Sequence, residues 1–215
     1  MALSKVDFNN INVTPAASKA LKFNSAADGF ETGDLGGNMV LLSTATASSS
    51  ATIDITSGID STYKEYQIHF TSIHPATDST KFTCQFDTGT NTSYNQAITS
   101  TFFRAAQDES ATTDFGYKTA EDQAQGTAFQ TLTGTIGNGN DESCAGILHL
   151  FDPANTTFVK HFFSRAFAYQ NISAQYNSDN FGAGYCNVTA AIDGVQFAMA
   201  SGNIDAGVIK MYGIL

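Results

Sequence analysis

The sequence predicts an all-β protein, a jelly-roll-like antiparallel β-sandwich that follows an extended N-terminal arm. Three observations favour this fold class. Hydrophobic residues make up 42% of the 215 residues and include 17 Phe and 8 Tyr, whereas only 14% are charged. Strand-like segments rich in aromatic and β-branched residues recur at a spacing of roughly 10–15 residues, with turn residues between them. No long helical pattern interrupts this series.

The first 36 residues differ from the rest and are predicted to form the arm, with a single β-sandwich domain over residues 37–215. Their apolar residues are irregularly spaced, and residues 16–21 are expected to form one or two helical turns. A disordered tail is the alternative interpretation. The large apolar side chains favour docking on a neighbouring subunit, because a free tail has no use for them. The candidate assembly residues are Phe8, Ile11, Phe23 and Phe30.

Alternation of apolar and polar residues marks the strands in the first half of the domain. Tyr66, Ile68 and Phe70 alternate with polar residues, which is the period-two pattern of a strand with one buried face. The same pattern recurs around Phe82 and Phe86. The expected strands in this half cover residues 39–46, 52–56, 66–71, 81–87 and 98–105.

A long polar segment then precedes the strands of the second half. Residues 106–125 are rich in acids and are expected to form a surface loop, with a short strand at residues 115–117. A loop of that length in a compact domain is often functional. A Gly-rich bend is expected just before residue 185. The later strands are expected at residues 129–133, 143–151, 158–169, 185–191, 195–199 and 208–214.

The phase of these strands also predicts the core. Apolar residues that share one phase of a half-buried strand point to the same face, and that face is the one that packs against the other sheet. The residues expected to face inward are Phe70, Phe82, Phe86, Leu148, Leu150, Phe197 and Met199.

The charge balance argues against two classes of partner. The formal net charge is −10, from 10 Lys and Arg against 20 Asp and Glu, and the basic residues are not clustered. Binding to phosphate groups needs clustered basic side chains, so direct binding to nucleic acid or to an anionic membrane is not expected. The sequence has no apolar run of about 18 residues and no signal-peptide pattern. We therefore expect no membrane span and synthesis in a cytoplasm.

The cysteines are expected to be structural. Cys84, Cys144 and Cys186 are an odd number, they form no C-x-x-C pair, and two of them lie in strand-like segments. Buried free thiols are the favoured interpretation. A disulfide or a metal site is the alternative.

The residues that could carry chemistry do not form a convincing catalytic set. Adjacent acids at 108–109, 121–122 and 141–142 could suggest a glycosidase, but that chemistry needs two carboxylates facing each other across a sugar. Solvated turn acids are the favoured interpretation. His149 and His161 lie in neighbouring predicted strands and could share a metal, although no zinc motif is present. We predict a protein that is not an enzyme and that has no cofactor and no metal site.

Two kinds of ligand remain as alternatives. Residues 139–143 and 152–155 carry oxygen ligands of the type that Ca²⁺ prefers, without the spacing of an EF-hand. A glycan could stack on tyrosines near turns, although these tyrosines are more simply explained as caps of the core. The tyrosines concerned are Tyr63, Tyr94, Tyr117, Tyr169 and Tyr176.

Several segments resemble structural proteins of the virions of tailed phages that infect marine bacteria such as cyanobacteria. They are HPATD at 74–78, DTGTNTSYN at 87–95 and SGNIDAGVIKMYG at 201–213, and the opening MALSK is similar to phage fibre-like proteins. The similarity extends from about Gly58 to Leu215. It implies a virion protein made in the cytoplasm of a bacterial host, often a jelly roll with an arm that joins neighbours. These segments have no catalytic meaning, so no functional residue is carried over.

The sequence and the resemblance together predict a capsid decoration or cement protein that is anchored by residues 1–36. Its expected partners are other virion proteins and further copies of itself, since multiplicity turns weak contacts into stable attachment. The rival hypothesis is a tail fibre or knob that binds glycans on the host surface. A glycan-degrading enzyme is a more distant third.

Overall fold

The computed structural model describes residues 13–14, 19–34, 37–89, 92–171 and 175–215, which divide into two compact units. The first unit is Met1–Asn38 and the second is Met39–Leu215. The second unit contains the sandwich.

The first unit holds a two-stranded hairpin. Strands β1 (Lys19–Phe23) and β2 (Phe30–Asp34) pair antiparallel, with Phe23 opposite Phe30. The side chain of Asn24 closes the turn, because its Oδ1 accepts the backbone N–H of Asp28 at 3.2 Å. The expectation of helical turns at residues 16–21 is wrong for the described part of that segment, which lies in β1.

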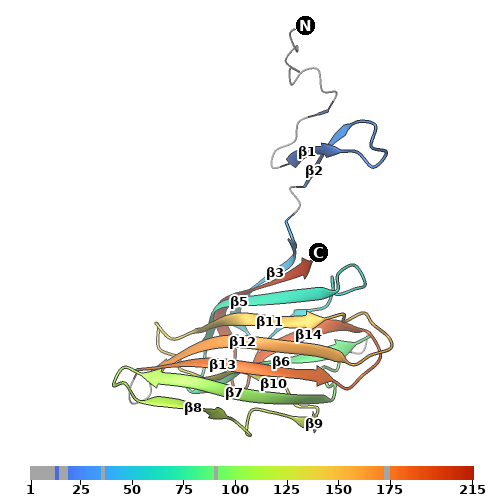
Figure 1. Cartoon of the computed structure of the whole chain (residues 1–215). Helices are drawn as coiled ribbons and strands as arrows, with labels where there is room; N and C mark the ends of the chain where they lie inside the picture. Colours follow the sequence, from blue (N-terminus) through green and yellow to red (C-terminus); the bar gives the residue numbers. More distant parts are fainter. Residues whose placement is uncertain (1–12, 15–18, 35–36, 90–91, 172–174) are drawn as a thin grey trace. The chain divides into compact units, whose positions relative to one another are not determined.

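The second unit is built from two antiparallel sheets (Figure 1). In the large sheet of nine strands the order is β3 (Met39–Ser50), β15 (Ile204–Ile214), β5 (Glu65–Pro75), β11 (Cys144–Phe151), β12 (Lys160–Asn171), β13 (Gln175–Cys186), β7 (Ile98–Asp108) and β8 (Thr113–Tyr117), with β9 (Ala124–Gly126) also paired to β7. The small sheet of four strands has the order β10 (Gln130–Ile136), β6 (Thr80–Thr88), β14 (Ile192–Met199) and β4 (Thr52–Ile55).

The chain passes repeatedly from one sheet to the other. Strands β4, β6, β10 and β14 belong to the small sheet, and the strand that follows each of them belongs to the large sheet. In Figure 1 the small sheet lies behind the central strands of the large sheet. The described residues contain no helix. The predicted all-β antiparallel sandwich is therefore confirmed, and jelly-roll connectivity stays a prediction.

Aromatic side chains fill the space between the sheets. The ring of Phe70 on β5 lies 5.2 Å from that of Phe82 on β6, which stacks at 5.5 Å on Phe197 of β14. Further along, Phe86 lies 5.2 Å from Phe162 of β12. The predicted inward-facing residues are confirmed, since all seven are buried: Phe70, Phe82, Phe86, Leu148, Leu150, Phe197 and Met199.

Two segments differ from the sequence-based expectation. The strand expected at residues 185–191 is instead β13, which begins at Gln175 and ends at Cys186, so the expected Gly-rich bend lies inside a strand. Glycine is needed there because a Cβ on Gly184 would lie 2.4 Å from the carbonyl oxygen of Thr99 on the neighbouring strand. The expected loop at 106–125 is shorter than predicted, because β7, β8 and β9 occupy part of it.

The three cysteines are buried free thiols, as predicted. Burial raises the pKa of Cys84, Cys144 and Cys186 far above the usual value, so these thiols stay protonated and unreactive. In the part of the chain that the structure describes, no helix is long and apolar enough to cross a membrane.

Truncating the aromatic contact between the sheets should strongly destabilise the sandwich. We expect Phe70→Ala and Phe197→Ala each to lower the free energy of unfolding by about 3–5 kcal/mol, because each leaves a cavity in a packed interior. Phe115→Ala is the matched control, since that ring is 77% exposed. Denaturant unfolding measures the change. A loss below about 1 kcal/mol at both core positions would contradict the assigned strand phases.

Candidate functional site

The outer face of the large sheet gathers most of the side chains that could bind a partner. Successive side chains of a strand point to opposite faces, so the residues that alternate with the core point away from the small sheet. Direct pairing across the strands aligns them in one transverse row. From one edge to the other this row contains Tyr117, Phe103, Phe181, Arg165, Ile147, His69, Lys210 and Thr44.

One part of this face is an aromatic patch, which we define as Phe103, Phe115, Phe163, Phe167 and Phe181 on β7, β8, β12 and β13. Phe103 stacks on Phe181 with ring centroids 4.6 Å apart, and Phe115 meets Phe103 edge-on at 6.2 Å. Most of these rings remain exposed to solvent. Clustered exposed rings on a sheet are a feature of interaction surfaces.

Arg165 is fixed at the centre of the aromatic patch. Its guanidinium lies 5.1 Å from the ring centroid of Phe167 and 4.9 Å from that of Phe181. It also donates two hydrogen bonds to the carboxylate of Asp179, at 3.1 and 2.7 Å. The cation is therefore already paired with a carboxylate within the protein and lies within cation–π distance of both rings.

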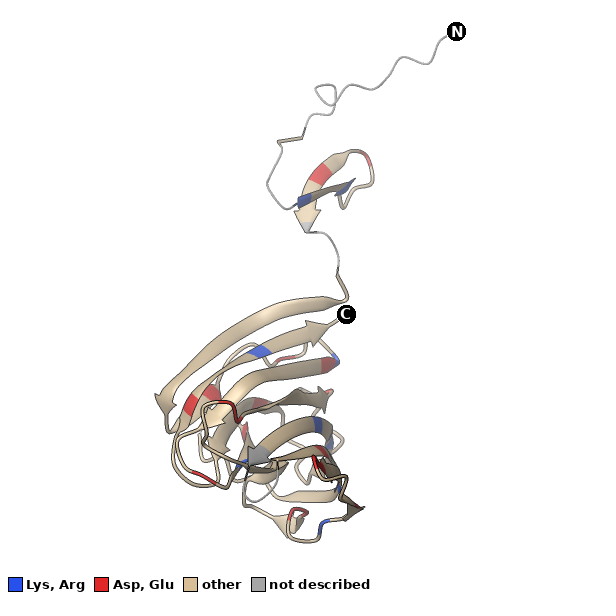
Figure 2. Ribbon diagram, turned by 90° about the vertical axis from the view of Figure 1, so that its left-hand side faces the viewer, with Lys and Arg blue, Asp and Glu red and all other residues tan. Residues whose placement is uncertain are grey.

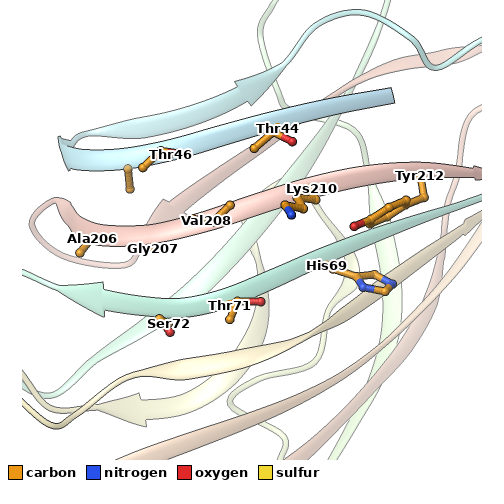
Figure 3. A pocket seen from close by; sticks show the side chains of 11 residues that line it. Thr44, Thr46, His69, Thr71, Ser72, Ala206, Gly207, Val208, Lys210 and Tyr212 are labelled. Carbon is orange, nitrogen blue, oxygen red and sulfur yellow. The ribbon is translucent and has the colours of Figure 1, made fainter. Parts of the chain in front are cut away.

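The other part of the outer face is a groove of about 770 Å³ over β3, β15 and β5 (Figure 3). That volume lies within the range of about 300–1,000 Å³ that is usual for small-ligand pockets. The polar side chains that line it come from all three strands, and they are Thr44, Thr46, His69, Thr71, Ser72, Lys210 and Tyr212.

Irregular pairing between β15 and β5 forms the floor of the groove. The register shifts twice between Ile204 and Val208, and Ser72 on β5 has a positive φ of 52°. Gly207 has a φ of 130°, and a Cβ there would lie 2.6 Å from Cδ1 of Ile73. These bulges bend both strands, and bulges often re-aim side chains beside binding sites.

The groove combines hydroxyl groups, one aromatic ring and one exposed ammonium. The ring of Tyr212 lies 5.0 Å from that of His69, and Lys210 is directly opposite His69 in the pairing. Burial, with a smaller effect of the neighbouring His149, lowers the pKa of His69, so its ring is uncharged at neutral pH. Lys210 therefore supplies the positive charge of the groove.

The predicted assembly residues fall partly within the described chain. Phe23 and Phe30 stack on one another across the hairpin with ring centroids 4.9 Å apart. Phe23 is 67% exposed and Phe30 is 45% exposed, so the stack leaves much of both rings in contact with water. Phe8 and Ile11 lie outside the described residues.

The acidic pairs are only partly the solvated turn acids that the sequence predicted. Glu109 and Asp141 do lie in turns and Asp108 ends strand β7, but the expectation is wrong for Glu121 and Glu142, which are held in structural contacts. Glu121 is 10% exposed, and both its oxygens accept hydrogen bonds from Lys81 Nζ at 2.7 Å. Glu142 is buried and accepts the N–H of Gly139. These carboxylates support the fold.

The candidate metal ligands are also held by other contacts. His149 does not pair with His161, because its ring stacks on Phe163 at 4.2 Å and its Nδ1 lies 2.7 Å from Glu65 Oε1. In the proposed calcium loop, Asp152 accepts hydrogen bonds from Lys64 and from Asn155. No group of three or more His, Cys, Asp or Glu side chains in the described parts of the chain is arranged to hold a metal ion.

The tyrosines considered as glycan platforms lie in different places. Tyr94 is buried, and Tyr63 packs against the core. Tyr117 is 52% exposed at the edge of the large sheet. The tyrosine that does line the groove is Tyr212, which the sequence analysis treated only as part of a strand.

The sequence contained a signal for the missed groove residues. In β15, Ile209 and Met211 are buried, so the alternate phase carries Val208, Lys210 and Tyr212 on the outer face. A cation and an aromatic ring two residues apart on an outward phase are candidates for binding.

The comparisons with known proteins add no relative: the sequence matches no family model and is similar to no curated protein or solved structure. The functional argument therefore rests on the chain's own residues and on the resemblance drawn from its sequence segments.

The two kinds of acid should respond differently to substitution. We expect Glu121→Ala to lower the free energy of unfolding by about 1–3 kcal/mol, because it leaves the half-buried ammonium of Lys81 without its partner. Asp141→Ala should change it by less than about 0.5 kcal/mol, since that side chain is exposed. Urea unfolding of both variants is the measurement. Equal effects at the two positions would contradict a structural role for Glu121.

Proposed function

We propose that this chain is a non-enzymatic structural protein of a virion, a capsid decoration or cement protein that is anchored through its N-terminal unit. Its partners are other virion proteins and further copies of itself, and it is made in the cytoplasm of a bacterial host. The resemblance of residues 74–78, 87–95 and 201–213 to phage proteins supports this origin.

The observation that carries the proposal is the exposed apolar hairpin of the first unit. Leu21, Phe23 and Phe30 are each at least 45% exposed. A two-stranded hairpin is at best marginally stable alone in water. Burying such a side chain fully against a partner contributes about 1.5–3 kcal/mol, which opposes the entropy lost on ordering the chain. A hairpin of this kind is suited to attachment.

The second unit is suited to act as a structural domain on the surface of a particle. Two sheets with an aromatic core form a rigid platform. Buried thiols that burial keeps protonated suit synthesis in a reducing cytoplasm. The acids Glu121 and Glu142 are used in structural contacts, which favours a role in assembly over one in hydrolysis.

A second candidate function is a tail fibre or knob that binds glycans on the host surface. The specific observation that favours it is the open groove on the outer face, which is lined by the ring of Tyr212 and by the hydroxyls of Thr44, Thr46 and Thr71. Hydroxyl groups both donate and accept hydrogen bonds, as sugar hydroxyls do.

The attachment proposal predicts a specific loss when the hairpin loses its rings. We expect Phe23→Ser combined with Phe30→Ser to lower the occupancy of particles by at least about tenfold, because two apolar anchors of more than 1.4 kcal/mol in total are removed. Particles that lack the protein are incubated with purified chain, and bound copies are counted by mass spectrometry.

The matched control is Phe158→Ser, since Phe158 lies in the second unit and is 68% exposed. It should leave occupancy unchanged. Deletion of residues 1–36 should abolish attachment and leave a folded sandwich by circular dichroism. Normal occupancy of the deleted protein would refute anchoring by this unit.

The receptor proposal predicts that the groove is required for attachment to cells. Labelled protein should bind marine bacterial cells, and Tyr212→Ala should weaken that binding roughly three- to tenfold through loss of one aromatic contact. Flow cytometry before and after removal of surface polysaccharide measures the effect. Tyr117→Ala, outside the groove, is the control. Binding that survives polysaccharide removal argues against a glycan receptor.

A further inference from the structure

The groove over β3, β15 and β5 contains a cation that the fold does not use. Lys210 projects from β15 between Thr44 and His69, its direct partners on the two neighbouring strands (Figure 3). It is exposed, and among the described residues no carboxylate lies within 4.0 Å of its Nζ. Its ammonium is therefore available to a ligand.

Every other Lys or Arg side chain of the second unit is bound to an acceptor in the described chain. Five of them lie within 4.0 Å of a carboxylate, and the sixth, Lys160, is buried and donates to the carbonyl oxygens of Phe158, Val188 and Thr189. The five paired residues are Lys64, Lys81, Arg104, Lys118 and Arg165. Lys and Arg are sparse along the ribbon of this acidic chain, whose net charge is −10 (Figure 2), so within the described part of the second unit an ammonium without a carboxylate partner is a specific feature.

Two acids on the strands that form the groove are held by other side chains. Asp205, beside the groove residue Ala206, accepts a hydrogen bond from Ser49 and lies 3.7 Å from His74. Glu65 is engaged with His149. None of the described residues that line the groove is an Asp or a Glu. An anion that enters therefore meets an unopposed ammonium, which attracts it as a point charge.

The rest of the lining fits a sugar better than an apolar ligand. Thr44, Thr46, Thr71 and Ser72 present four hydroxyls along the two sides, and Tyr212 closes one end with a ring. Hydroxyl pairs satisfy each other's donors and acceptors, whereas an apolar ligand would leave them without partners. The groove is also open along the sheet surface, so a chain longer than one sugar could pass through it.

We propose that this groove binds an anionic saccharide, with Lys210 bound to its acidic group, the threonine and serine hydroxyls bound to its sugar hydroxyls, and Tyr212 stacked on a sugar ring. This assignment rests on the second proposed function, glycan binding. It adds that the bound glycan is negatively charged and that Lys210 binds the charged group. An ammonium does not distinguish a carboxylate from a sulfate, so the proposed ligands include both carboxylated and sulfated saccharides.

The test compares saccharides that differ only in charge, using the full chain and isothermal titration calorimetry. The probes are lactose, sialyllactose and sulfated lactose, together with trigalacturonate and its methyl ester. We expect at least one acidic probe to bind about tenfold more tightly than its neutral counterpart, as one charge-assisted hydrogen bond implies. Added salt should reduce that preference.

Substitutions at Lys210 test whether this residue causes the preference for acidic saccharides. Lys210→Met keeps the aliphatic stem and removes the charge, so it should weaken binding of the acidic probe about tenfold and leave a neutral probe nearly unchanged. Lys210→Arg should keep the preference. Lys64→Met is the control, because it changes net charge equally at a residue outside the groove whose side chain is 78% exposed.

The outcomes separate this inference from the function on which it rests. Equal binding of acidic and neutral probes, with no effect of Lys210→Met, would overturn the inference and leave glycan binding intact. Failure of every probe to bind would overturn the inference, and retained binding of polysaccharide-bearing cells would then show that the glycan function itself survives. An equal loss of affinity for the acidic probe in Lys64→Met would show that the net charge of the protein causes the preference, which would also overturn the inference.

Discussion

The contact between the rings of Phe70, Phe82 and Phe197 ties the two sheets together, and the outer surface of the large sheet depends on it. Phe70 belongs to β5, whereas the other two rings lie on paired strands of the small sheet. Because successive side chains of a strand point to opposite faces, burying Phe70 turns His69 outward. Burial of the neighbours of Lys210 does the same on β15. Core packing therefore also determines which side chains form the groove.

The strands that pattern reasoning located are those whose two faces differ in polarity. Around Phe70 and Phe82 the alternation is strict, so position and phase could both be predicted. Strand β13 was misplaced because Gly182 and Gly184 resemble a bend, yet they lie in a strand whose neighbours leave no room for a Cβ. That constraint comes from residues distant in sequence, such as Thr99, and no local pattern contains it.

The groove was harder to predict than the fold for a related reason. Lys210 and Tyr212 could have been assigned to the outer face from their strand alone. Their position beside Thr44 and His69 depends on β15 lying between β3 and β5, and on register shifts near Ser72. Such shifts follow from tertiary packing. The exposed rings of the first unit, in contrast, could be singled out from sequence, because large apolar residues in a polar segment need a partner.

The position of β15 within the large sheet has a consequence for the order of folding. Among the strands that the structure describes, β3 pairs with β15 alone, whereas β15 pairs with β3 on one side and β5 on the other. During translation β3 emerges first, and it has no partner in its sheet until β15 has left the ribosome. This long-range pairing makes closure of the sheet a late step. Until then the nascent chain carries an unpaired strand, so association with another chain before synthesis is complete is a hazard of this topology.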